Sequence, residues 1–79
     1  MHPVCFSPAR LRAIRDDRGH SRRTLANSCG MSAAAIKDYE VGRRTPGADA
    51  LGRLAAELGC SVDDFYIRFA FEQLVPDAV

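Results

Sequence analysis

The stretch "CGMSAAAIKDYEVGRRTPG", residues 29–47, decides the fold. Gly30 ends one predicted helix, and Ser32 is a typical N-cap of the next, because its hydroxyl accepts a hydrogen bond from an unpaired backbone amide. Leu25 on the first helix and Ile36 on the second belong to their buried faces. Only one tight turn separates the two helices, so they must cross sharply and cover each other. The stretch therefore predicts a helix-turn-helix.

Similar start and stop signals place three more helices around this pair. Serines precede the first and last of these segments, the glycines and proline of "GRRTPG" precede the other, glycines or a proline follow the predicted ends, and apolar residues recur at helical spacing between them. The predicted segments are residues 8–18, a helix capped by Ser21 and ending near Cys29, a helix capped by Ser32, residues 48–58 and residues 62–75. We expect an all-α fold of five helices without strands, forming a single domain over residues 1–79 with its core at residues 8–66.

The last predicted helix is apolar on two sides. Val62, Phe65, Tyr66 and Phe69 share one face at 100° per residue, and this face is expected to cover the core. The opposite face is formed by Ile67, Phe71, Leu74 and Val75. Either this second face binds another subunit, or the terminal segment frays or folds back over its own domain.

The net charge of +1 conceals a strong asymmetry along the chain. Residues 1–44 hold nine basic and four acidic side chains, a net charge of +5, whereas residues 45–79 hold two basic and six acidic ones, a net charge of −4. The first half is suited to attract a polyanion, and the second half would be repelled by it.

Several other functions find no support in the sequence. The three cysteines are widely spaced and have only two histidines as possible partners, so we expect neither a disulfide framework, a zinc site nor any other metal. No phosphate loop or pair of nucleophile and base is visible, which argues against an enzyme or a cofactor. No apolar run is long enough to cross a membrane and no signal-peptide pattern is present, so we expect a cytoplasmic protein.

Three separate segments resemble the Cro/repressor-type helix-turn-helix domain, also called lambda repressor-like or XRE. They are "LR.IR...G.S...LA", "GMS...I..YE.GRR.P" and "L..LA..LG.S.DD.Y", and they lie between Leu11 and Tyr66 at the family's spacing. The resemblance implies a five-helix DNA-binding domain. The helix after Ser21 would lie across the DNA backbone, and the helix after Ser32 would enter the major groove.

The resemblance also implies roles for individual residues. Residues expected at phosphates are Arg22, Arg23, Ser32, Arg43 and Arg44, and residues expected at base edges or the adjacent backbone are Ala33, Ala34, Lys37 and Asp38. Arg22 stands where relatives often have glutamine, and it either contacts a phosphate or remains a solvated surface charge. Ser32 is expected to cap the helix whether or not its hydroxyl also contacts a phosphate.

The alanines depart from what a base-reading helix usually carries. Alanine can meet a thymine methyl group but forms no hydrogen bond to a base edge, whereas Lys37 can reach guanine or phosphate. Asp38 either accepts from a cytosine amine or repels the duplex. Two interpretations follow: specificity comes from methyl contacts, a few polar pairs, operator spacing and DNA deformability, or the helix has lost its reading role.

Five further side chains are expected to have structural roles. Arg15 and Glu40 match positions that in relatives form a partly buried ion pair between the first helix and the end of the third. Cys29 and Cys60 fall where the pattern has a small apolar residue, and both are expected in the core. Tyr39 is expected in the core with its hydroxyl near the surface.

Two functions of different classes remain. The first is a homodimeric, sequence-specific transcriptional regulator, either a repressor or an autoregulator, that binds a pseudo-palindromic operator in double-stranded DNA. This regulator would have no catalytic activity. The second is a protein-interaction module or antitoxin-like adaptor that binds its partner through the apolar last helix. Mass in solution separates them, because a self-complementary face predicts a dimer.

Overall fold

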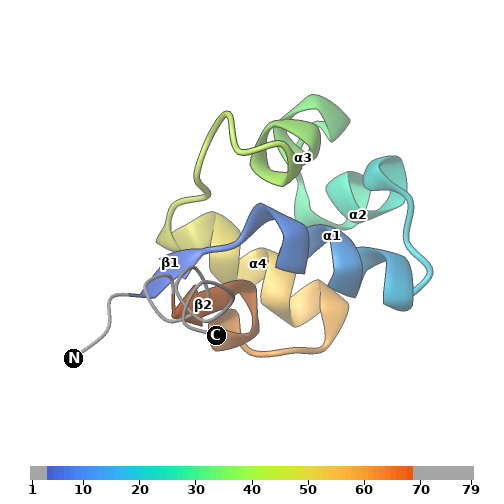
Figure 1. Ribbon diagram of the computed structural model, residues 1–79. Helices are drawn as coiled ribbons and strands as arrows, with labels where there is room; N and C mark the ends of the chain where they lie inside the picture. The colour runs from blue at the N-terminus through green and yellow to red at the C-terminus, as the bar shows by residue number, and fades with distance from the viewer. Residues whose placement is uncertain (1–3, 69–79) are drawn as a thin grey trace.

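The computed structural model describes residues 4–68 as a helical domain with one small strand pair at its edge (Figure 1). Its elements are β1 (Val4–Phe6), α1 (Pro8–Asp17), α2 (Arg22–Cys29), α3 (Ala33–Glu40), α4 (Ala48–Leu58), the short 3-10 helix η1 (Val62–Phe65) and β2 (Tyr66–Arg68). The predicted helical fold class is confirmed, with four α-helices in the described residues in place of the five expected. None of the helices in this range has the length and apolar character needed to cross a membrane.

Local capping chemistry sets the helix starts. Ser7, Ser21 and Ser32 each have extended backbone angles, and each hydroxyl accepts a hydrogen bond from a backbone amide three residues further on, at 3.0 to 3.2 Å. Pro8 occupies the first position of α1, where a helix needs no backbone N–H. The predicted bounds of the fourth helix, residues 48–58, agree with those of α4.

The predicted fifth helix is wrong over residues 66–68. Ser61 and Asp64 form the expected reciprocal cap, in which the Ser61 amide donates to the Asp64 carboxylate at 3.0 Å, but the cap opens only the four residues of η1. Tyr66 then turns to extended angles (φ −112°, ψ 148°). Residues 69–75 of the predicted helix lie outside the described part of the chain.

Pairing with the N-terminal segment accounts for this change. β1 and β2 are antiparallel, with Phe6 opposite Tyr66 and Val4 opposite Arg68. The Ser7 amide donates to the Phe65 carbonyl at 2.7 Å, and the Phe6 ring meets the Tyr66 ring edge-on at 6.3 Å between centroids. Because these contacts join residues 58 to 64 positions apart in the sequence, no local sequence pattern predicts them. The expectation of a structure without strands is therefore also wrong.

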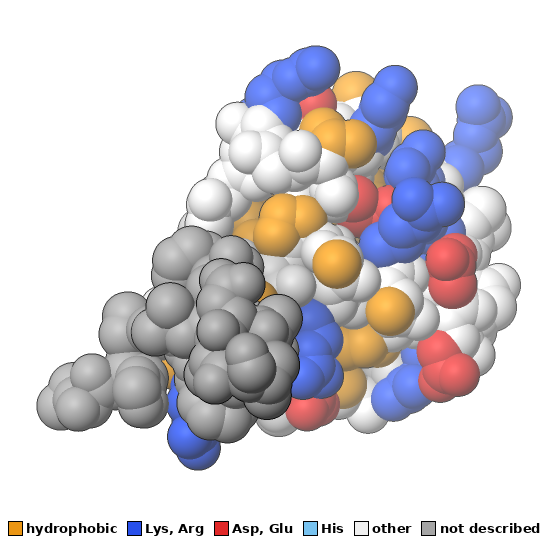
Figure 2. Space-filling view, viewed as in Figure 1, with side chains coloured by type: hydrophobic (Ala, Val, Ile, Leu, Met, Phe, Trp, Pro, Cys, Tyr) orange, Lys and Arg blue, Asp and Glu red, His pale blue; other side chains and the backbone are white. Residues whose placement is uncertain are grey.

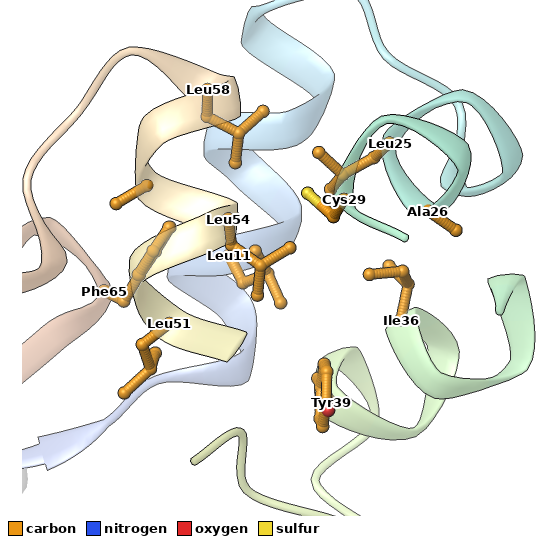
Figure 3. Close-up of a cluster of buried hydrophobic side chains, with 11 residues drawn as sticks. Leu11, Leu25, Ala26, Cys29, Ile36, Tyr39, Leu51, Leu54, Leu58 and Phe65 are labelled. Carbon is orange, nitrogen blue, oxygen red and sulfur yellow. The ribbon is translucent and has the colours of Figure 1, made fainter. Parts of the chain in front are cut away.

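The core lies between α1, α4 and the helix-turn-helix formed by α2 and α3 (Figure 3). Fully buried side chains come from every layer: Leu11, Leu25, Ile36, Leu54 and Phe65. In the close-up, Leu25 and Ile36 extend from α2 and α3 toward Leu11 and Leu54. This packing fixes the orientation of α3 relative to the rest of the domain.

Tyr39 and Cys29 belong to this core, whereas Cys60 is half-buried at its edge. Burial raises the pKa of the Cys29 thiol, and Glu57 raises it further. Burial likewise raises the pKa of the Cys60 thiol. Both shifts favour the neutral thiol. Cys29 lies in the core as expected, whereas Cys60 was expected there and lies at its edge.

We expect Phe65→Ala to lower the free energy of unfolding by about 3–5 kcal/mol, because it empties a fully buried ring site next to β1 and β2. Urea denaturation followed by circular dichroism measures this change. Val4→Ala is the matched control, since Val4 is 61% exposed, and should stay within about 0.5 kcal/mol of the wild type. Equal losses in the two variants would contradict the assigned core.

Candidate nucleic-acid interface

The turn between α2 and α3 positions the candidate interface. Gly30 ends α2 in the left-handed region (φ +69°), where a side chain is strained, and the Met31 amide closes the turn on the Ala26 carbonyl at 2.9 Å. Ser32 then caps α3. The three-residue turn holds the buried faces of both helices against one core and leaves the outer face of α3 open to solvent.

The outer face of α3 carries the residues expected at base edges. Ala33, Ala34 and Lys37 are exposed, whereas Asp38 is half-buried, with 21% of its side chain exposed. Ile36, Tyr39 and Glu40 form the inner face of the same helix. Within the described residues, Lys37 forms no salt bridge, so its ammonium group is available to a ligand.

Arg15 of α1 and Glu40 at the end of α3 form a buried ion pair, with 8% and 1% of their side chains exposed. Arg15 Nε donates to Glu40 Oε2 at 2.6 Å and its terminal nitrogen donates to Oε1 at 3.1 Å, which is a bidentate arrangement. The hydrogen bonds to Glu40 raise the pKa of the Arg15 guanidinium, against the opposing effect of burial. The other terminal nitrogen of Arg15 donates to the His20 carbonyl at 2.8 Å, which ties the turn between α1 and α2 into the same cluster.

Arg22 shares the carboxylate of Glu40. Its Nε donates to Glu40 Oε1 at 3.0 Å, while 36% of its side chain remains exposed. Neither alternative considered from the sequence, phosphate contact or solvated charge, included this ion pair. Arg15 also pairs with Asp16 at 3.2 Å, so the cluster of two arginines and two carboxylates is formally neutral. The cluster holds the Arg22 guanidinium at the start of α2, where the helix dipole is positive.

Arg43 and Arg44 follow α3 and surround Asp38. Their nearest nitrogens lie 3.4 Å and 3.8 Å from the two oxygens of that carboxylate, and their backbone amides both donate to the Asp38 carbonyl. The Arg44 guanidinium also lies over the Tyr39 ring, 5.5 Å from its centroid. Both carboxylate oxygens of Asp38 thus face the loop that holds Arg43 and Arg44.

The expected phosphate-contacting arginines lie near the C-terminal end of α3, because Arg22 pairs with Glu40, the last residue of that helix. Arg22 and Arg23 lie at the start of α2, and Arg43 and Arg44 follow the end of α3. Figure 2 shows Lys and Arg side chains projecting from the part of the surface that carries these helices, with acidic groups among them. Arg23 is exposed and forms no ion pair among residues 4–68.

Sequence reasoning missed Val41, which caps the C-terminus of α3 and is 53% exposed. Its backbone amide donates to the Lys37 carbonyl at 2.9 Å, so it continues the helical path of the exposed face. Its seven-residue spacing from Ala34, two helical turns, was the signal that would have found it.

Of the four residues predicted to bind another subunit, the structure describes one. Ile67 lies in β2 opposite Cys5 and is half-buried; Phe71, Leu74 and Val75 lie outside the described residues. Residues 4–68 also hold no group of three or more His, Cys, Asp or Glu side chains that could bind a metal ion.

The fold and the open third helix define a helix-turn-helix DNA-binding domain, and comparisons with known proteins agree. The helix-turn-helix family model matches residues 11–65, more than half of the chain. The chain belongs to this family, in its Cro/repressor (XRE) type, and is a DNA-binding transcriptional regulator. No curated protein matches it.

Several solved structures share the fold. The restriction-modification controller protein C.AhdI from Aeromonas hydrophila is 28% identical, with a TM-score of 0.71 over 73% of this chain and 88% of that one. The P22 c2 repressor, solved in complex with a synthetic operator, is 29% identical, with a TM-score of 0.70 over 75% and 89%. The clp gene regulator ClgR from Corynebacterium glutamicum is 30% identical, with a TM-score of 0.74 over 90% and 76%.

We expect Glu40→Gln to destabilise the domain by about 3–5 kcal/mol, because it leaves the buried Arg15 without its counter-charge. Urea denaturation measures the loss. Asp49→Asn, which breaks the exposed ion pair between Asp49 and Arg53, is the control and should cost less than about 1 kcal/mol. Similar costs for the two variants would show that the Glu40 cluster does not hold the helices together.

Proposed function

We propose that this chain acts as a homodimeric repressor or autoregulator that places α3 in the major groove of a pseudo-palindromic operator. The observation that carries the proposal is the open face of α3, with Lys37 at its middle and with Arg22, Arg43 and Arg44 near the C-terminal end of the helix. The proposed activity is binding to cytoplasmic DNA, without catalysis.

The dimensions of the site support this docking. An α-helix with its side chains is about 10–12 Å across, and the major groove, about 12 Å wide, admits one such helix. With α3 in the groove, Arg22 and the Arg43–Arg44 loop are placed to meet the phosphates that flank it. Such contacts give affinity and orientation without reading sequence.

A single copy of this face offers few base contacts, which supports a dimer. Two copies of α3 about 34–36 Å apart would enter successive major grooves on one side of the duplex. The repressor of P22 was solved on a synthetic operator, and C.AhdI is named as a controller protein of a restriction-modification system. The apolar residues Ile67, Phe71, Leu74 and Val75 are the proposed subunit contact.

A second candidate function, a protein-interaction adaptor, is favoured by one comparison. The chain is 25% identical to a SinR protein solved in complex with SinI protein, with a TM-score of 0.69 over 90% of this chain. The same apolar C-terminal residues would then bind a different protein. In that case the purified chain is expected to be monomeric.

We expect the double variant Arg43→Ala and Arg44→Ala to weaken binding to every duplex and to flatten its salt dependence. Each lost phosphate contact lowers the slope of log K against log salt by about 0.9, so the slope should fall by about 2 per subunit. Fluorescence anisotropy titrations between low and physiological salt measure it. Arg68→Ala, in β2, is the control; a slope unchanged in the loop variant would remove these arginines from the interface.

We expect Phe71→Glu combined with Leu74→Lys to produce monomers that retain helical circular dichroism, because charges in an apolar contact oppose its desolvation. Light scattering measures the mass of wild type and variant at the same concentration. An intact dimer in the variant would refute the proposed subunit contact. A monomeric wild type would favour the adaptor function.

A further inference from the structure

The open face of α3 is built almost entirely of methyl groups. Ala33, Ala34 and Val41 supply them, and Lys37 is the hydrogen-bonding side chain among them. Asp38 is half-buried against Arg43 and Arg44, and the Ser32 hydroxyl accepts a hydrogen bond from the Ala35 amide as the helix cap. The polar groups that flank this face are therefore already engaged within the protein.

These side chains form one stripe along the helix. At 100° per residue, Ala34 and Val41 differ in direction by about 20°, and Lys37 lies on the same side between them. The seven residues from Ala34 to Val41 rise by about 10.5 Å, which equals about three base-pair steps of 3.4 Å. The stripe therefore has the length needed to follow neighbouring base edges along the groove.

Val41 stands out on this surface. Val4 and Val41 are the two exposed large apolar side chains in the described range. Val41 lies between Lys37 and the Arg43–Arg44 loop. Exposure of a valine to water is unfavourable, and contact with another apolar group is favourable because it removes both apolar surfaces from water. The apolar group that the major groove presents is the methyl on C5 of a pyrimidine, found in thymine and in 5-methylcytosine.

We propose that α3 reads C5-methyl groups of pyrimidines, and that Val41 is a specificity-determining residue that contacts one of them beyond those met by Ala33 and Ala34. This inference rests on the proposed insertion of α3 in the major groove. It adds the chemical class of base feature that is recognised, and it assigns a reading role to a residue that no sequence motif singled out.

Replacing thymine by deoxyuridine tests the inference directly, because it removes the methyl group and leaves the hydrogen-bonding groups of the base pair in place. A duplex is first selected from a random pool with the full-length protein at near-physiological salt. Each thymine of that duplex is then replaced in turn, and dissociation constants are measured for the wild type, Val41→Ala and Val4→Ala. Val4 matches Val41 in size and exposure but lies in β1.

We expect the wild type and Val4→Ala to lose about 3–5-fold in affinity at the thymines whose methyl groups are contacted, as the burial of one methyl group predicts. Val41→Ala should become insensitive at one such thymine in each half-site and remain sensitive at the others. At these positions, a 5-methylcytosine·guanine pair should bind about 3–5-fold more tightly than a cytosine·guanine pair if the methyl group itself is read. Equal affinity for the 5-methylcytosine·guanine and cytosine·guanine pairs would contradict recognition of the methyl group as such.

The outcomes separate this inference from the proposed function. An enriched duplex whose affinity is unchanged by every uracil replacement would overturn the methyl reading and leave the regulator intact. Identical uracil profiles for Val41→Ala and Val4→Ala would remove Val41 from the reading face. Failure to enrich any sequence would overturn the proposed operator binding itself, and the methyl reading with it.

Discussion

The carboxylate of Glu40 is the group on which the geometry of the interface depends. Glu40 belongs to α3, and it accepts hydrogen bonds from Arg15 of α1 at 2.6 and 3.1 Å and from Arg22 of α2 at 3.0 Å. A buried ion pair of this kind contributes little net stability compared with apolar packing, since desolvation offsets the attraction. Its effect is on arrangement, because any other orientation of the three helices would leave a buried charge without a partner. Among the described residues, every buried side-chain polar atom does have one.

A similar cluster lies two residues earlier in α3. The carboxylate of Asp38 lies between the guanidinium groups of Arg43 and Arg44, as the carboxylate of Glu40 lies between those of Arg15 and Arg22. Held in this way, the arginines lose less side-chain freedom when they meet a phosphate. The cost is partial neutralisation of the charge that attracts the duplex. The surface around α3 is therefore less positive than its arginines alone would make it.

The parts of the fold that follow local rules were predictable from the sequence. Serine caps, glycine ends and apolar spacing placed the helix-turn-helix and gave α4 its bounds. The segment after Ser61 had an equally good start signal, but its continuation depends on the antiparallel pairing of Val4–Phe6 with Tyr66–Arg68. The candidate site shows the same division. The exposed positions of α3 follow from its periodicity, whereas the contact between Arg22 and Glu40 joins two helices and is invisible to any local pattern.

The composition of α3 also limits how sequence can be discriminated. A bidentate arginine or glutamine distinguishes one base pair by about 1–3 kcal/mol, and α3 has neither on its open face. Methyl contacts discriminate less, and the ammonium of Lys37 is a point charge without a fixed fork geometry. A half-site read in this way cannot stand out among the many competing sites of a genome. The proposed dimer would supply the missing discrimination by requiring two half-sites at one spacing and by responding to the ease with which the DNA between them deforms, so that the assembly would read the operator more than the single helix does.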